Sequence, residues 1–190
     1  MHRVGNILRQ WLPLAVTIVG LIGVIYIVAQ QGFRMGANDL PVQLAHDGAE
    51  ARSAGADPAS LVGQGTVELS QELGSFIMVF DESGAVVASS ARLRGKVPEL
   101  PPGVLDVARL RGEDRVTWEP EYGVRMATVI TRVRGGPGGF VLAGHSLREA
   151  EGHIGQAGLL CALGAIALLV GSLAAVVFCE FALPKAPQAA

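Results

Sequence analysis

Cysteine is scarce in this 190-residue sequence, which contains only Cys161 and Cys179. Both lie in one apolar stretch, where a helix would hold them about 27 Å apart, too far for a disulfide between them. The region between residues 31 and 156 contains no cysteine at all. We therefore expect neither a disulfide nor a thiolate metal site in that central region.

Charged residues are also few, at 17% of the chain, and they are concentrated in the centre. Residues 31 to 156 hold 12 of the 15 basic residues and 16 of the 17 acidic ones. This mildly acidic region lacks the concentrated basic face that nucleic acid favours, so we expect no nucleic-acid partner.

Histidine is equally sparse and shows no ligand spacing. The four histidines are His2, His46, His145 and His153. A metal site would need carboxylates from distant segments to converge on one of them. We expect no metal ion and no other cofactor.

Two apolar runs stand out against this background, because residues 12–29 and 157–179 contain no charged residue. Each run is long enough to cross about 30 Å of hydrocarbon as a helix. The first could instead be a cleaved signal peptide, since Arg3 and Arg9 provide a positive start. The run is longer than a signal core, and no cleavage site of the A-x-A type follows it. We therefore expect uncleaved transmembrane helices at 12–30 and 157–179, in a lipid bilayer.

Flanking charge predicts how these helices are oriented. The N-terminal tail, residues 1–11, is basic, and the C-terminal tail, residues 180–190, carries Lys185 against Glu180. Basic flanks favour the cytoplasm. The prediction is a two-pass protein of the cell (inner) membrane with both termini cytoplasmic and residues 38–153 forming an extracytoplasmic, periplasmic domain.

The central region begins its clearest pattern at residues 76–90, FIMVFDESGAVVASS. Two apolar runs flank a polar turn, which predicts strands at 76–80 and 85–90 joined by a turn at 81–84. Gly84 can adopt positive φ there, and Asp81 can hydrogen-bond its own backbone.

The elements before this hairpin are predicted to be helical. The glycines of QQGFRMGAND, residues 30–39, predict a break or bend after the first apolar run. Asn38 and Asp39 can then cap a new helix, with Pro41 in its first turn. Gly55 would end that helix, and Pro58 would begin a second short one.

The elements after the hairpin complete an α+β fold. A proline-rich loop at 91–103 precedes a helix at 104–111, followed by strands within 115–120, 123–133 and 139–147. Three strands joined by short turns form an antiparallel meander, to whose edge the hairpin must add. The sequence predicts a five-stranded antiparallel sheet with flanking helices, between two transmembrane helices.

This order of elements resembles the PAS-like, single-Cache sensor domains of bacterial membrane receptors, such as sensor histidine kinases. The resemblance rests on VFDESGAVVASS at residues 79–90 and on the meander, and it covers roughly residues 38–153. It implies a sensor domain between two membrane helices. Such receptors continue into an output domain, whereas this chain ends some ten residues after the second apolar run. A sensor of this kind would therefore pass its signal to a partner.

The resemblance also implies a small-molecule pocket between the sheet and its covering loops. The residues expected to border it are Trp118, Tyr122, Arg125 and His145. Two of these have simpler alternatives, because Trp118 can pack in the core and Arg125 can pair with Glu119 or Glu121.

Catalysis is not expected. A hydrolase would need a serine such as Ser89 or Ser90 near Asp81 and His145, but the sequence has no G-x-S-x-G elbow. We expect that the protein is not an enzyme.

Small residues recur along the second apolar run at spacings that allow close helix contact. They are Gly164, Ala167, Gly171 and Ala175. They predict a homodimer or docking to a partner membrane signalling protein, with a lipid-facing helix as the alternative.

Two functions follow from these patterns. The first is a membrane-anchored sensor-like module that binds a small ligand or relays a signal through a partner. The second is a structural or accessory membrane protein whose outer domain binds another protein.

Overall fold

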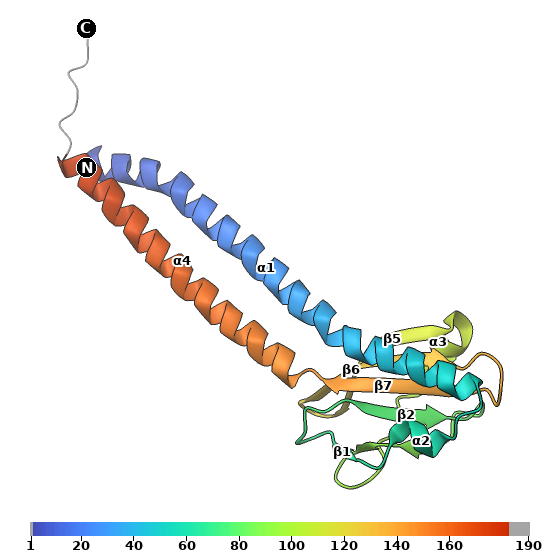
Figure 1. Ribbon diagram of the computed structural model, residues 1–190. Coiled ribbons are helices and arrows are strands. Elements are labelled where there is room, and N and C mark those ends of the chain that lie inside the picture. Colours follow the sequence, from blue (N-terminus) through green and yellow to red (C-terminus); the bar gives the residue numbers. More distant parts are fainter. Residues whose placement is uncertain (1, 183–190) are drawn as a thin grey trace. The chain divides into compact units, whose positions relative to one another are not determined.

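The computed structural model describes residues 2–182, which form four helices and seven strands (Figure 1). In chain order the elements are α1 (His2–Ser53), α2 (Pro58–Val62), β1 (Val67–Glu68), β2 (Phe76–Phe80), β3 (Val86–Ser89), β4 (Ala91–Arg92), α3 (Val104–Arg111), β5 (Glu113–Glu121), β6 (Val124–Arg132), β7 (Phe140–Ser146) and α4 (Arg148–Ala182). They divide into two compact units, of which one holds Phe33–Gly152 and the other the remaining helical segments. Most of the predicted C-terminal tail, residues 183–190, lies outside the described residues.

The Phe33–Gly152 unit contains the predicted five-stranded antiparallel sheet, with strand order β3-β2-β7-β6-β5. The hairpin joins the meander through β2, whose Met78 pairs with Leu142 of β7. The meander is confirmed by the pairing of Val129 with Ala143 and of Val116 with Thr128. The α+β fold class and the flanking helices are therefore as predicted.

The hairpin turn forms by the predicted local chemistry. Asp81 Oδ1 accepts hydrogen bonds from the backbone N–H groups of Ser83 and Ala85, both at 2.9 Å. Gly84 has a φ of +87°, which only glycine adopts readily. The local sequence therefore accounts for the shape of this turn.

One face of the sheet is covered by the C-terminal part of α1. Ala45 packs against Val129 and Ala143, and Ala49 against Val133 and Val141. Small residues let this helix lie close to the strands: a Cβ atom on Gly48 would stand 2.9 Å from Val141 Cγ1. Side chains on this face come from every second strand position, as a sheet requires.

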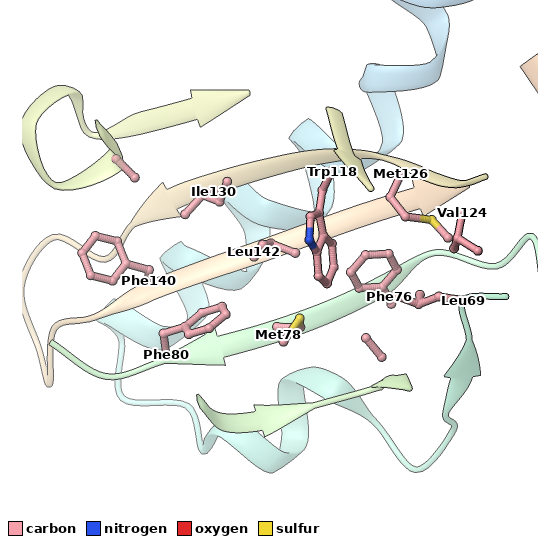
Figure 2. Close-up of a cluster of buried hydrophobic side chains, with 12 residues drawn as sticks. Leu69, Phe76, Met78, Phe80, Trp118, Val124, Met126, Ile130, Phe140 and Leu142 are labelled. Atoms are coloured by element: carbon pink, nitrogen blue, oxygen red, sulfur yellow. The ribbon is translucent and has the colours of Figure 1, made fainter. Parts of the chain in front are cut away.

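The opposite face carries the main hydrophobic core (Figure 2). Its buried members are Leu69, Phe76, Met78, Phe80, Ala91, Ala108, Trp118, Val124, Met126, Ile130, Phe140 and Leu142. Phe76 and Trp118 meet with their ring centroids 6.2 Å apart and tilted by 58°. Leu100, Val104 and Leu105, from the proline-rich segment and α3, pack against this core and close it.

Two short strands on this side were not predicted. β1 and β4 form a parallel two-stranded sheet in which Val67 pairs with Ala91. β4 follows β3 after one residue, at the start of the segment that the sequence predicts to be a loop. The pairing depends on contacts between positions far apart in sequence, which a local pattern does not reveal.

Of the predicted break or bend at residues 30–39, the break does not occur, because α1 is continuous from His2 to Ser53. Glycine within a helix costs only about 1 kcal/mol relative to alanine, so Gly32 and Gly36 weaken the helix without ending it. Asn38 caps nothing: its side-chain amide donates to the Arg34 carbonyl one turn earlier, at 3.1 Å. Pro41 is fully buried within the helix rather than at a new helix start.

Both predicted transmembrane segments lie within α1 and α4, which are long and apolar enough to cross a membrane. In the second unit these helices contact each other through polar pairs. Trp11 Nε1 donates to Ser172 Oγ at 3.0 Å, and Asn6 Nδ2 donates to Glu180 Oε2 at 2.9 Å. Neither pair was predicted.

The predicted small-residue contact face lies elsewhere on α4. Ala167, Gly171 and Ala175 are exposed, and Gly164 is partly buried. A Cβ atom on Gly164 or Gly171 would meet no other atom within 4 Å. These residues therefore do not make the α1–α4 contact, and pairing with another chain stays a prediction.

Candidate functional site

A groove of about 680 Å³ lies over one end of the sheet, on the same side as the main core. The hairpin turn forms one wall, the proline-rich residues 97–103 a second, and α3 a third. Turn and helix come close together, since a Cβ atom on Gly84 would stand 3.1 Å from Leu105 Cδ1. The volume is within the range of small-molecule sites, which is about 300–1,000 Å³.

The groove lining is mainly apolar with a few charged groups. Its charged members are Glu99, Asp106 and Arg109. Arg109 is already engaged, with Nη1 2.6 Å from Asp106 Oδ1 and Nη2 3.1 Å from the Glu82 carbonyl. Its guanidinium also lies 5.2 Å from the centre of the Phe140 ring. Two carboxylates against one paired guanidinium favour a neutral or cationic occupant over an anion.

The structure separates the four residues that were expected to border one pocket. Trp118 is only 3% exposed and belongs to the main core, whereas Tyr122 is 98% exposed at the β5–β6 turn. Arg125 and His145 lie on the sheet face that α1 covers, because they alternate with the core residues Met126 and Gly144. None of the four lines the groove.

Arg125 has a partner that the sequence did not indicate. Its Nη1 pairs with Glu151 Oε1 near the start of α4. The expected partners are used elsewhere: Glu121 pairs with Arg94, and Glu119 Oε1 accepts the Gly123 N–H at 2.8 Å. The predicted alternative of a pair with Glu119 or Glu121 is therefore wrong.

The residues weighed for hydrolysis do not converge. The hydrogen-bond partner of His145 Nδ1 is Ser75 Oγ, at 3.1 Å, rather than Ser89 or Ser90. Ser90 Oγ accepts a hydrogen bond from the Ile77 N–H and donates one to the Ile77 carbonyl. Asp81 Oδ1 accepts a hydrogen bond from the Ser83 N–H within its own turn. Within residues 2–182 no cluster of histidine, cysteine and carboxylate side chains can hold a metal ion.

No direct signal in the sequence pointed to the groove. The proline-rich segment reads as a loop, and the helix at 104–111 is indicated by its apolar spacing and by the glycine that follows it. Val97 and Leu100 among the prolines were the available signal, because apolar side chains in a loop need a surface to pack on.

Three carboxyl groups of the sheet unit are stabilised in their charged form. Hydrogen bonds from the Arg94 and Gly95 backbone N–H groups hold the pKa of Glu68 below its ordinary value of 4.5. The Ser83 hydroxyl and then the Ala85 N–H lower the pKa of Asp81 below 3.8. Burial raises the pKa of Glu113, but hydrogen bonds from His46 and Arg115 outweigh it and bring the net pKa below 4.5.

These shifts predict an acid-sensitive sheet unit. A carboxyl with a lowered folded-state pKa contributes stability above its unfolded pKa, and this contribution is lost as pH falls through the folded value. We expect the free energy of unfolding to be nearly constant from neutral pH to about pH 5 and to fall below about pH 4.5. Urea unfolding of the full chain in detergent micelles at a series of pH values measures this. Stability that rises toward pH 3 contradicts the prediction, and Asp81→Asn should flatten part of the slope.

Comparison with protein-family models, curated proteins and solved structures found no match for this chain.

Proposed function

We propose that this chain is a membrane-anchored sensor-like module, in which the sheet unit binds a small ligand and relays the event to a partner through α1 and α4. Both helices would cross the cell (inner) membrane, with both termini cytoplasmic and the sheet unit extracytoplasmic. The order of the main elements resembles that of PAS-like, single-Cache sensor domains. That resemblance supports the proposal, and the geometry of β7 carries it.

β7 is the central strand of the sheet and connects to both apolar helices. Its Val141 is in close contact with Gly48 of α1, so that movement of the strand acts on that helix. At its other end a single residue, Leu147, separates β7 from α4. The Leu147 N–H donates to the Arg125 carbonyl at 2.9 Å, and Glu151 pairs with the Arg125 side chain. Within the described residues, β7 and the first turn of α4 are therefore joined by this one residue.

The groove between the hairpin turn, residues 97–103 and α3 is the proposed ligand site. It lies against β2, which pairs directly with β7. Its apolar lining and its two carboxylates favour a small neutral or cationic molecule. A ligand that draws α3 toward the hairpin would act on β2 first and then on β7.

The proposal is tested with the full chain in lipid nanodiscs and a panel of small neutral and cationic metabolites. A ligand that binds only the folded state adds about 2.7 kcal/mol of stability at a hundredfold excess over its Kd. We expect at least one compound to slow hydrogen exchange of the β2 and β7 amides in a saturable way. The same compound should change exchange at Leu147 and Arg148, where the signal would pass into α4.

Two tryptophan variants on α3 locate the site. Leu105→Trp should fill the groove and abolish the effect, because Leu105 lines it. Leu110→Trp is the matched control, because Leu110 is 87% exposed on the same helix and is not part of the groove. Protection that survives Leu105→Trp places the ligand elsewhere. If the folded protein binds none of the compounds, the result would favour the second function, binding of another protein.

A further inference from the structure

Four arginines gather where α3 ends and β6 meets the loop to β7. They are Arg109, Arg111, Arg132 and Arg134, and all four line one hollow of about 390 Å³. A second hollow of about 420 Å³ adjoins it and shares Arg111, Gly112, Arg132 and Arg134 with it. Neither hollow is the groove described above. Arg109 lines both that groove and the first hollow.

Two of these arginines have structural partners. Arg109 pairs with Asp106, and Arg132 Nη1 donates to the Arg109 carbonyl at 3.1 Å, which satisfies the C-terminal end of α3. Arg111 and Arg134 differ, because within residues 2–182 neither side chain has a hydrogen bond or an ion pair. Both are exposed and border both hollows. Arg134 reaches into the shared part, where its Nη2 stands 2.8 Å from the position of a Cβ atom on Gly112.

The loop from β6 to β7 adds backbone donors to the first hollow. Gly135 and Gly136 line it, and in the described part of the chain their N–H groups have no acceptor. The loop is held in place on two sides. A Cβ atom on Gly136 would stand 2.7 Å from the Ser53 carbonyl oxygen, and one on Gly138 would stand 2.4 Å from Glu82 Oε1. Successive backbone N–H groups in a fixed turn form a concave site for anions.

The acidic groups around the hollows are mostly engaged. Glu82 Oε1 accepts the Gly139 N–H at 3.2 Å and lies 4.0 Å from Arg132. Glu113 and Glu50 border the second hollow but not the first. The Glu113 carboxylate is paired with the side chains of His46 and Arg115. Within residues 2–182, the lining of the first hollow therefore includes two arginines whose guanidinium groups have no partner and two glycines whose N–H groups have no acceptor. Its carboxylate, Glu82, already accepts a hydrogen bond.

We propose that the first hollow binds a small molecule through an oxyanion, either a phosphate or a carboxylate group. Guanidinium groups match such oxygens with paired donors, and backbone N–H groups complete the contact. The hollow is larger than one oxyanion, which leaves room for the rest of a small metabolite. This site does not depend on the groove or on its ligand.

The test is a titration of the full ¹⁵N-labelled chain in nonionic micelles with inorganic phosphate and, separately, with malonate. Ionic strength is held constant with chloride, which screens without forming paired contacts. We expect saturable shifts of the Gly135 and Gly136 amide signals. Saturation by phosphate alone assigns a phosphate group, and saturation by malonate alone assigns a carboxylate.

Substitutions then test the arginines. Arg111→Gln and Arg134→Gln should each raise the titration midpoint at least tenfold, because each removes a charge-assisted hydrogen bond. Arg134→Lys keeps the charge but loses the paired N–H donors of the guanidinium, and should raise the titration midpoint less than Arg134→Gln does. Arg94→Gln is the control of equal charge, since Arg94 pairs with Glu121 away from the hollow, and it should leave the midpoint within about twofold.

Two results overturn the proposal. In the first, chloride at equal ionic strength shifts the Gly135 and Gly136 amide signals as much as phosphate or malonate does. That would show that only charge screening is at work. The other is a saturable midpoint that Arg111→Gln and Arg134→Gln leave unchanged while amide signals outside the loop show intact folding.

Discussion

Replacing Gly139 with alanine should destabilise the sheet unit by about 3–5 kcal/mol, through backbone strain and overpacking together. Gly139 has a φ of +100°, in a region that alanine rarely adopts. A Cβ atom there would stand 2.1 Å from the Phe80 carbonyl oxygen, which is backbone and cannot rotate away. Relief would require β2 and β7 to separate at the pair Phe80–Phe140. Urea unfolding of the full chain in micelles, followed by hydrogen exchange of β2 and β7, measures the loss.

Gly135→Ala is the matched control within the same loop. Gly135 has a similar φ of +89°, but a Cβ atom there would meet nothing within 4 Å. It should therefore show only the conformational cost, about 1–2 kcal/mol. Equal effects of the two substitutions would mean that the close approach to Phe80 contributes nothing, contrary to the expectation.

Replacing Phe76 with alanine should cost about 3–5 kcal/mol, the usual loss for a large aromatic side chain deleted from a core. Phe76 is 1% exposed and packs against Trp118. Its ring also fills the space over Gly144 on β7: a Cβ atom there would stand 2.3 Å from Phe76 Cζ. Deletion therefore leaves a cavity in the main core, over Gly144. The free energy of unfolding of the full chain, measured by urea titration, gives the size of the loss.

Two comparisons test whether the cavity is the cause. Tyr122→Ala removes an aromatic ring that is 98% exposed and should change stability by no more than about 0.5 kcal/mol. Gly144→Ala should be harmful in the wild type but much less so in the Phe76→Ala background, where the space is open. Additive effects of the two core substitutions would show that Phe76 and Gly144 do not share this space.

Elements that depend on neighbouring residues were predicted well. The turn at residues 81–84 follows from one carboxylate and one glycine within four positions, and both act as expected. The meander follows from three apolar, β-branched runs joined by short turns. The place of the hairpin also followed, because a two-stranded ribbon must bury its apolar face and the meander offered an edge.

Predictions that depended on distant residues were less successful. The sequence predicts a nearby carboxylate as the partner of Arg125, yet the structure pairs it with Glu151, because β6 runs beside the strand that leads into α4. The helix break failed for another reason: local glycine propensity costs little compared with continued hydrogen bonding along α1.

The sequence by itself determined the two apolar helices, the hairpin, the meander and the antiparallel sheet, since these depend on the order and polarity of neighbouring residues. Only the tertiary structure decided which side chains share a face or a hollow. Trp118 and Arg125 lie on opposite faces of the sheet, because strand positions alternate and α1 covers one side only. Arg111 and Arg134 line the same hollow because α3, β5 and β6 fold back on one another, and a one-dimensional pattern of charges does not contain that geometry.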